Sequence, residues 1–109
     1  MNMQDSVSCK QCTNPLAYVF VTEQNLSHTT LTSFFTHYNI EHSQKDFVKI
    51  GLLAERVVRE VLTFYEIRTV FIANNTLTVV LKNNKQWETL PDQIVRIIEK
   101  AQDEFGEML

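Results

Sequence analysis

The sequence predicts a two-layer α+β domain of order ββαββα, with a mostly antiparallel four-stranded sheet and two helices on one of its faces. Two segments, near residues 52–65 and 91–104, repeat apolar residues with the helical period. Between them lie two runs rich in β-branched residues, 67–73 and 76–82, separated by two asparagines. This change of period along the chain favours a sheet covered by helices.

The first half of the chain supplies the other two expected strands. Leu16 to Thr22 is an apolar run rich in β-branched and aromatic residues, and Leu31 to Thr36 is a second such run. The polar segment 25–30 is typical of a turn, so we expect these two strands to form a hairpin. Residues 39–49 are mostly polar and are interpreted as a connection with room for one turn of helix.

The first main helix and the hairpin after it have clear local signals. Apolar side chains recur at one-turn spacing along the helix, at Leu53, Val57, Val61 and Tyr65. Asn tolerates positive φ better than other residues with a side chain, so Asn74 and Asn75 suit a two-residue turn. We expect this turn, together with the exposed faces of the helices, to be a partner-binding surface.

The second main helix has a start signal. Thr89 can cap it, Pro91 fits a first turn where its missing N–H costs nothing, and Asp92 lies at the positive end of the helix dipole. Before the expected terminator Gly106, its buried stripe consists of Ile94, Ile98, Ala101 and Phe105. Trp87 either packs beneath this helix or is an exposed contact for a partner protein.

Length and composition indicate one domain with short tails. A chain of 109 residues with 44% hydrophobic residues can bury a core without stabilising disulfides or metal ions. Residues 1–12 are expected to be a mobile N-terminal tail, residues 13–105 the folded domain and residues 106–109 a C-terminal tail. No run is long and apolar enough to span a membrane and no leader is recognisable, so we expect a cytoplasmic protein. We also expect it to be a monomer or a weak homodimer.

Charge and composition argue against two function classes. The net charge is −3 and no basic patch is present, so nucleic acid is not an expected partner. The aromatic cluster Phe34, Phe35 and Tyr38 is better explained as a core-facing strand than as a stacking platform, since no Lys or Arg adjoins it. The sequence contains no glycine-rich phosphate loop and no nucleophile elbow. We therefore expect a protein that is not an enzyme.

Cys9 and Cys12 have a direct chemical interpretation. Two thiolates in a Cys-x-x-Cys pattern can chelate a metal ion or two corners of an iron–sulfur cluster, and a homodimer would supply four ligands to a [4Fe–4S] cluster or zinc. Free thiols on a solvated tail and a reversible redox pair are the alternatives. A zinc site shared with His37 and His42 is a further one, although the 24 residues between Cys12 and His37 make an unusually long linker. No cofactor is expected in the folded domain itself.

Several short motifs follow one another in a recognisable order. They are Thr13-Asn14-Pro15, Leu52-Leu53-Ala54, Val70-Phe71, Leu77-Thr78-Val79, and Trp87 ahead of the helix begun by Pro91. This order, over roughly residues 13–101, resembles the N-terminal domain of the Nfu/NifU-type iron–sulfur cluster scaffold proteins. Thr13-Asn14-Pro15 is similar to a shortened form of the family's opening Thr-Pro-Asn-Pro motif, whereas Gly51 stands where the family carries Ser-Pro.

The resemblance implies a function as well as a fold. The family's N-terminal domain is thought to help recognise client or assembly proteins, and its cluster ligands lie in a separate C-terminal domain that this chain, as a stand-alone domain, would lack. Cys9 and Cys12 do not match those ligand positions. Our first hypothesis is a non-catalytic interaction domain associated with iron–sulfur cluster assembly or delivery, with assembly or client proteins as partners. The alternatives are a metal-binding or redox protein that uses Cys9 and Cys12, and an adaptor domain of another pathway.

Overall fold

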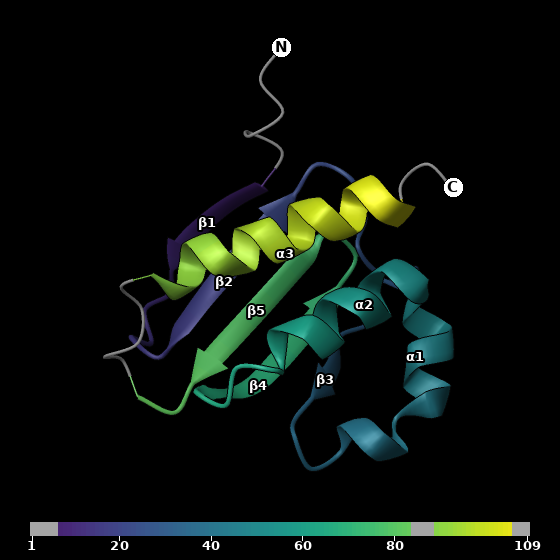
Figure 1. Ribbon diagram of the computed structural model, residues 1–109, viewed down its shortest axis with the longest axis horizontal. Coiled ribbons are helices and arrows are strands. Elements are labelled where there is room, and N and C mark those ends of the chain that lie inside the picture. The colour runs from purple at the N-terminus through teal and green to yellow at the C-terminus, as the bar shows by residue number, and fades with distance from the viewer. Residues whose placement is uncertain (1–6, 84–88, 106–109) are drawn as a thin grey trace.

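The computed structural model describes residues 7–83 and 89–105, which form a five-stranded antiparallel sheet and three helices (Figure 1). The strands are β1 (Val7–Gln11), β2 (Ala17–Thr22), β3 (Ser33–Phe35), β4 (Ile67–Ala73) and β5 (Thr76–Leu81). The helices are α1 (Gln44–Ile50), α2 (Leu52–Val61) and α3 (Leu90–Phe105), with a 3-10 turn at Ile40–His42. The strands lie in the order β1-β2-β5-β4-β3, so the expected α+β class is confirmed.

The prediction of four strands and two helices is wrong in two details. β1 lies inside the expected N-terminal tail, and Val7–Gln11 pairs with β2 along its whole length. Only Val7 of this edge strand is buried, so the sequence offers no alternation from which a strand could be predicted. The other addition is α1, a short helix in the predicted connection that buries Phe47 and Ile50.

The two predicted N-terminal strands, β2 and β3, do not form a hairpin with each other. β2 pairs with β5, and β3 pairs with β4 on the other side of the β4–β5 hairpin. The connecting residues 23–32 cross the end of the sheet, where the backbone N–H groups of Leu26 and Ser27 both donate to the Asn74 carbonyl at 2.8 Å. These hydrogen bonds hold the connection at the point where it passes from one side of the central hairpin to the other.

The hydrophobic core lies between the sheet and the helices, and Figure 1 shows α2 and α3 crossing the same face of the sheet. The predicted stripes are confirmed as buried at Leu53, Val57, Val61, Ile94, Ile98 and Ala101. The prediction is wrong for Tyr65, which lies beyond the end of α2 and is 72% exposed. α1 joins the same layer, because Phe47 stacks on Phe35 of β3 with ring centroids 4.9 Å apart.

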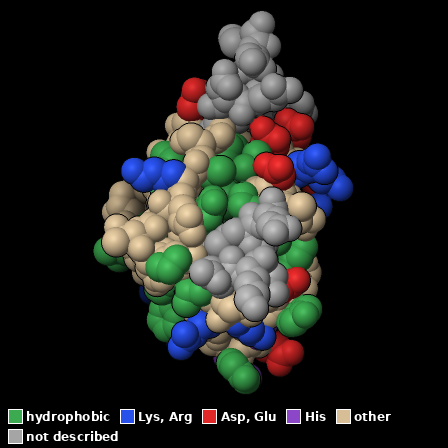
Figure 2. Space-filling view, turned by 90° about the vertical axis from the view of Figure 1, so that its left-hand side faces the viewer, with side chains coloured by type: hydrophobic (Ala, Val, Ile, Leu, Met, Phe, Trp, Pro, Cys, Tyr) green, Lys and Arg blue, Asp and Glu red, His purple; other side chains and the backbone are tan. Residues whose placement is uncertain are grey.

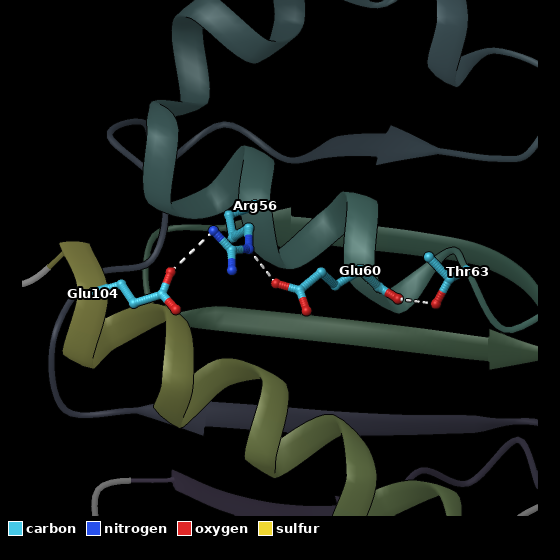
Figure 3. Close-up of polar contacts among 4 residues, drawn as sticks. All are labelled: Arg56, Glu60, Thr63 and Glu104. Carbon is cyan, nitrogen blue, oxygen red and sulfur yellow. Dashed lines mark hydrogen bonds and ion pairs between the residues drawn. The ribbon is translucent and has the colours of Figure 1, made fainter.

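Arg56 links α2 to the C-terminal end of α3. Its guanidinium pairs with Glu60 one turn further along α2 and with Glu104 of α3 at 3.0 Å (Figure 3). The hydrogen bond that Arg56 donates to Glu60 raises the pKa of Arg56. The guanidinium also lies 5.8 Å from the ring centroid of Phe105, which adds a contact to the last turn of α3.

Gly51 forms the bend between α1 and α2. Its φ of 94° and ψ of 170° lie in a region that is almost restricted to glycine. A Cβ at this position would lie 2.8 to 2.9 Å from ring atoms of His28. Because the N–H of His28 donates to the carbonyl of Ile50 at 2.9 Å, the connection 23–32 is also fastened to this bend.

We expect Gly51→Ala to lower the free energy of unfolding by about 1–3 kcal/mol, because alanine must adopt a strained φ and its Cβ must displace His28. Urea denaturation followed by circular dichroism measures this loss. The double variant Gly51→Ala/His28→Ala should recover part of it, since it removes the steric contact and leaves the backbone strain. A Gly51→Ala protein as stable as the parent would contradict this conformation of the bend.

Candidate functional site

Cys9 and Cys12 lie at the β1 edge of the sheet. Cys9 is in β1 opposite Phe20, a core residue, whereas the N–H of Cys12 donates to the carbonyl of Ala17 at 2.9 Å and so continues the β1–β2 ladder. Successive side chains of a strand point to opposite faces, so residues three apart do as well. Cys9 therefore points to the helix side of the sheet and Cys12 to the other side.

This placement does not fit a metal or cluster held by both cysteines of one chain. A chelate requires the two sulfurs on one side of a turn, whereas continued strand alternation directs Cys9 and Cys12 to opposite faces of the edge strand. Within residues 7–83 and 89–105, no group of three or more His, Cys, Asp or Glu side chains is arranged to hold a metal ion. The expected chelate assumed that Cys9 and Cys12 lie on a flexible tail that can bring the two sulfurs together. Cys9 lies instead in a strand, β1.

The environment of Cys9 also lowers its reactivity. Partial burial, with a smaller contribution from the negative charge of Asp92 in α3, raises the pKa of the Cys9 thiol. A raised pKa leaves less thiolate near neutral pH, and the thiolate is the nucleophile and the metal ligand. Cys9 is nevertheless an exposed thiol, so it stays accessible to reagents.

The zinc site with His37 and His42 is not assembled either. His37 follows β3, and its Nε2 lies 2.7 Å from the carbonyl oxygen of Leu62 at the end of α2. β1 and β3 are the two edge strands, separated by four strand spacings, or about 19 Å. The two cysteines and the two histidines consequently lie at opposite edges of the molecule.

Asn74 and Asn75 form the two-residue turn that the sequence predicts. Asn74 has a φ of 53°, and Ala73 pairs with Thr76 across the turn. The Nδ2 of Asn75 donates to the Thr22 carbonyl at 2.7 Å, and the N–H of Asn74 donates to the Thr29 carbonyl at 2.9 Å. These contacts give the turn a role in the fold, and its expected role in partner binding stays a prediction. Trp87, the other expected contact, lies outside the described residues.

The sheet has a second surface, on the side opposite the helices, that sequence reasoning missed. Strand register places Phe34, Phe71, Thr78, Val19 and Lys10 in one row across all five strands. Two flanking rows contain Thr69, Val80 and Ala17, and Ala73, Thr76, Val21 and Ser8. We call these twelve residues the outer sheet face. All of them except Ala17 are partly or fully exposed.

The outer sheet face mixes apolar side chains with threonine, serine and Lys10, and none of its twelve residues is acidic. An antiparallel sheet with one solvated face usually alternates apolar and polar residues, but here valines and phenylalanines occupy the solvated side as well. Phe34 is 56% exposed, and its ring lies 6.3 Å from that of Phe71. In Figure 2, which looks onto the side with β1, hydrophobic side chains lie in the centre of the view and at its lower left, right and bottom, and most acidic side chains lie in the upper part.

The sequence contained a signal for this surface. The runs AYVFVT of β2 and TLTVVL of β5 are almost continuously apolar or β-branched, with no charged residue on either face. Such runs are typical of strands with apolar contacts on both sides. Apolar contacts could therefore be expected on both faces of the sheet, whereas the helices cover only one face.

Comparisons with known proteins give a fold and no family. No family model matches the chain, and no curated protein matches it. Among solved structures, protein SAV1430 from Staphylococcus aureus aligns with a TM-score of 0.61 and 12% sequence identity, over 84% of this chain and 96% of that chain. A likeness at this identity shows a shared fold and carries no function. Within the described residues, no helix is long and apolar enough to cross a membrane.

The assigned environment of Cys9 predicts how this thiol responds to a change in α3. Asp92→Asn removes a negative charge, so it should lower the pKa of Cys9, increase the thiolate fraction near pH 8 and speed alkylation by iodoacetamide about twofold. Peptide mass spectrometry measures the rate at each cysteine. Cys12 is an internal reference, and Asp103→Asn, near the other end of α3, is the matched control. An unchanged Cys9 rate in Asp92→Asn would contradict the assigned contact.

Proposed function

We propose that this chain is a non-catalytic protein-interaction domain that serves iron–sulfur cluster assembly or delivery in the cytoplasm. The outer sheet face is the observation that carries the interaction role. The order of motifs from Thr13-Asn14-Pro15 to Pro91, which resembles the Nfu/NifU N-terminal domain, is what supports the pathway. The partners under this proposal are iron–sulfur assembly or client proteins.

The interaction role follows from the cost of leaving apolar surface in water. Phe34, Phe71 and Val19 form part of one continuous row, and none of them is fully covered. Removing apolar surface from water contributes about 25 cal/mol per Å². Partly exposed apolar side chains that lie together on one face make that face a candidate contact surface.

The alternative role as a metal or redox protein receives less support from the structure. Its two thiols lie on opposite sides of the sheet, and burial raises the pKa of one of them. The adaptor alternative shares the outer sheet face with our proposal and differs in the identity of the partner. Identifying the partner protein therefore distinguishes the adaptor alternative from our proposal.

Direct binding tests the proposal. The purified chain should bind at least one iron–sulfur scaffold, carrier or client protein of the same organism with a dissociation constant near the micromolar range typical of transient contacts, measured by calorimetry. Proteins of similar size and charge without clusters are the control set. Binding to none of the iron–sulfur proteins, or equal binding to the control set, would sink the pathway assignment.

Metal analysis after anaerobic purification tests the role of the cysteines separately. We expect the parent chain and the Cys9→Ala/Cys12→Ala variant to be equally free of stoichiometric iron, zinc and sulfide, because the sheet keeps the two thiols apart. Absorption spectra and elemental analysis give the readout. Iron with sulfide at about half a cluster per chain, lost in the variant, would instead make β1 the ligand-bearing segment of a dimer.

A further inference from the structure

The outer sheet face differs in charge from the rest of the molecule. Among the described residues, the five strands contain two charged side chains, and both are basic: Lys10 in β1 and Arg68 in β4. The described acidic residues all lie in helices, turns and connections. In a chain of net charge −3, the sheet is therefore the part with the least repulsion toward an acidic partner.

One of the two basic residues, Lys10, belongs to the outer sheet face, and the other, Arg68, is next to Thr69 of that face in the chain. Lys10 stands at one end of the central row, opposite Val19. Arg68 is exposed and lies in the irregular stretch at the start of β4, beside Thr69. An apolar centre between two separated cations is complementary to an apolar surface with acidic residues on both flanks.

The dimensions of the outer sheet face select a small partner. Four strand spacings give a width of about 19 Å, and three rows of side chains give a length of about 13 Å. The resulting footprint is on the order of 300 Å², well below the roughly 800 Å² per partner of a stable interface. A second copy packed face to face would gain too little area for a stable dimer. A helix of three turns, about 16 Å long and 10 Å wide, fits within this footprint.

We propose that the outer sheet face binds an amphipathic helix of a partner protein, with its apolar stripe on the row from Phe34 to Val19 and acidic residues paired to Lys10 and Arg68. The inference rests on the proposed function, because it names the surface and the chemistry of the partner in that interaction. Helix recognition of this kind uses apolar anchors at one-turn spacing for affinity and flanking charges for orientation.

Single-stranded nucleic acid is the competing occupant, since Phe34 and Phe71 could stack on bases. Binding of that kind uses a positively charged groove that follows the backbone. Lys10 and Arg68 lie on strands that are separated by β2 and β5, so they do not form a continuous track. A peptide helix needs no such track, and the charges favour it.

Two synthetic helical peptides of about 14 residues serve as probes, with the same leucine stripe and either Glu or Lys on both flanks. Titrated into the ¹⁵N-labelled full chain, the Glu peptide should cause saturable amide shifts at Val19, Phe71 and Thr78. Phe34→Ser should weaken this binding about tenfold. Lys10→Glu should weaken the Glu peptide about threefold and strengthen the Lys peptide, as expected for one exposed ion pair.

Leu52→Ser is the matched control, because Leu52 is 64% exposed, against 56% for Phe34, and lies at the start of α2. It should leave peptide binding unchanged, and circular dichroism should show both variants folded. Shifts confined to α2 and α3, or equal binding of the two peptides, would overturn the inference. Saturable binding of oligo(U) that shifts the same amides would also overturn the inference. A stable dimer in sedimentation experiments that Phe34→Ser dissociates would do so as well.

The outcomes also separate this inference from the proposed function. If an iron–sulfur protein binds and Leu52→Ser abolishes that binding while Phe34→Ser does not, the surface is wrong and the function stands. If the Glu peptide binds as expected and no iron–sulfur protein does, the surface stands and the pathway is wrong.

Discussion

The carbonyl oxygen of Asn74 fastens the connection between β2 and β3 to the central hairpin, because it accepts the backbone N–H groups of Leu26 and Ser27 at the tip of that hairpin. The positive φ of Asn74 forms the turn that presents this carbonyl. The connection 23–32 is thereby held across the end of the sheet and delivers β3 to the far side of the hairpin. A direct β2–β3 pair would leave this carbonyl without those two donors, and a lost hydrogen bond of this kind costs about 1 kcal/mol.

The sheet order that results has consequences for both faces. On the inner face, α1, α2 and α3 bury the side chains of the central strands. Arg56 joins α2 to α3, and the Phe35–Phe47 stack joins α1 to β3. On the outer face, the same five strands bring an unbroken row of side chains from Phe34 to Lys10 to the surface. The same order places Cys9 and His37 at opposite edges, which separates the residues that sequence spacing had grouped.

Local patterns in the sequence were sufficient for α2, α3 and the Asn74–Asn75 turn, because helix periodicity and turn chemistry depend on near neighbours. They were insufficient for β1, an edge strand that buries Val7 alone. The expected pairing of β2 with β3 was wrong because strand pairing depends on non-local contacts, here β2 with β5, β3 with β4 and the hydrogen bonds at Asn74. For the candidate site, the Cys-x-x-Cys spacing alone does not fix the geometry. In a turn the two thiols point to the same side, whereas in a strand they point to opposite faces. The outer sheet face could have been anticipated from the uncharged runs of β2 and β5.

The central claim, that this fold leaves an apolar sheet face open, is tested most directly by methyl NMR with a soluble gadolinium relaxation agent. The methyl groups of Val19, Val21 and Val80 on the outer sheet face should relax strongly with added agent, whereas those of the core residues Val70 and Val79 should be protected. Equal protection of both sets at low protein concentration would show that the face is covered within the chain, and would contradict the account.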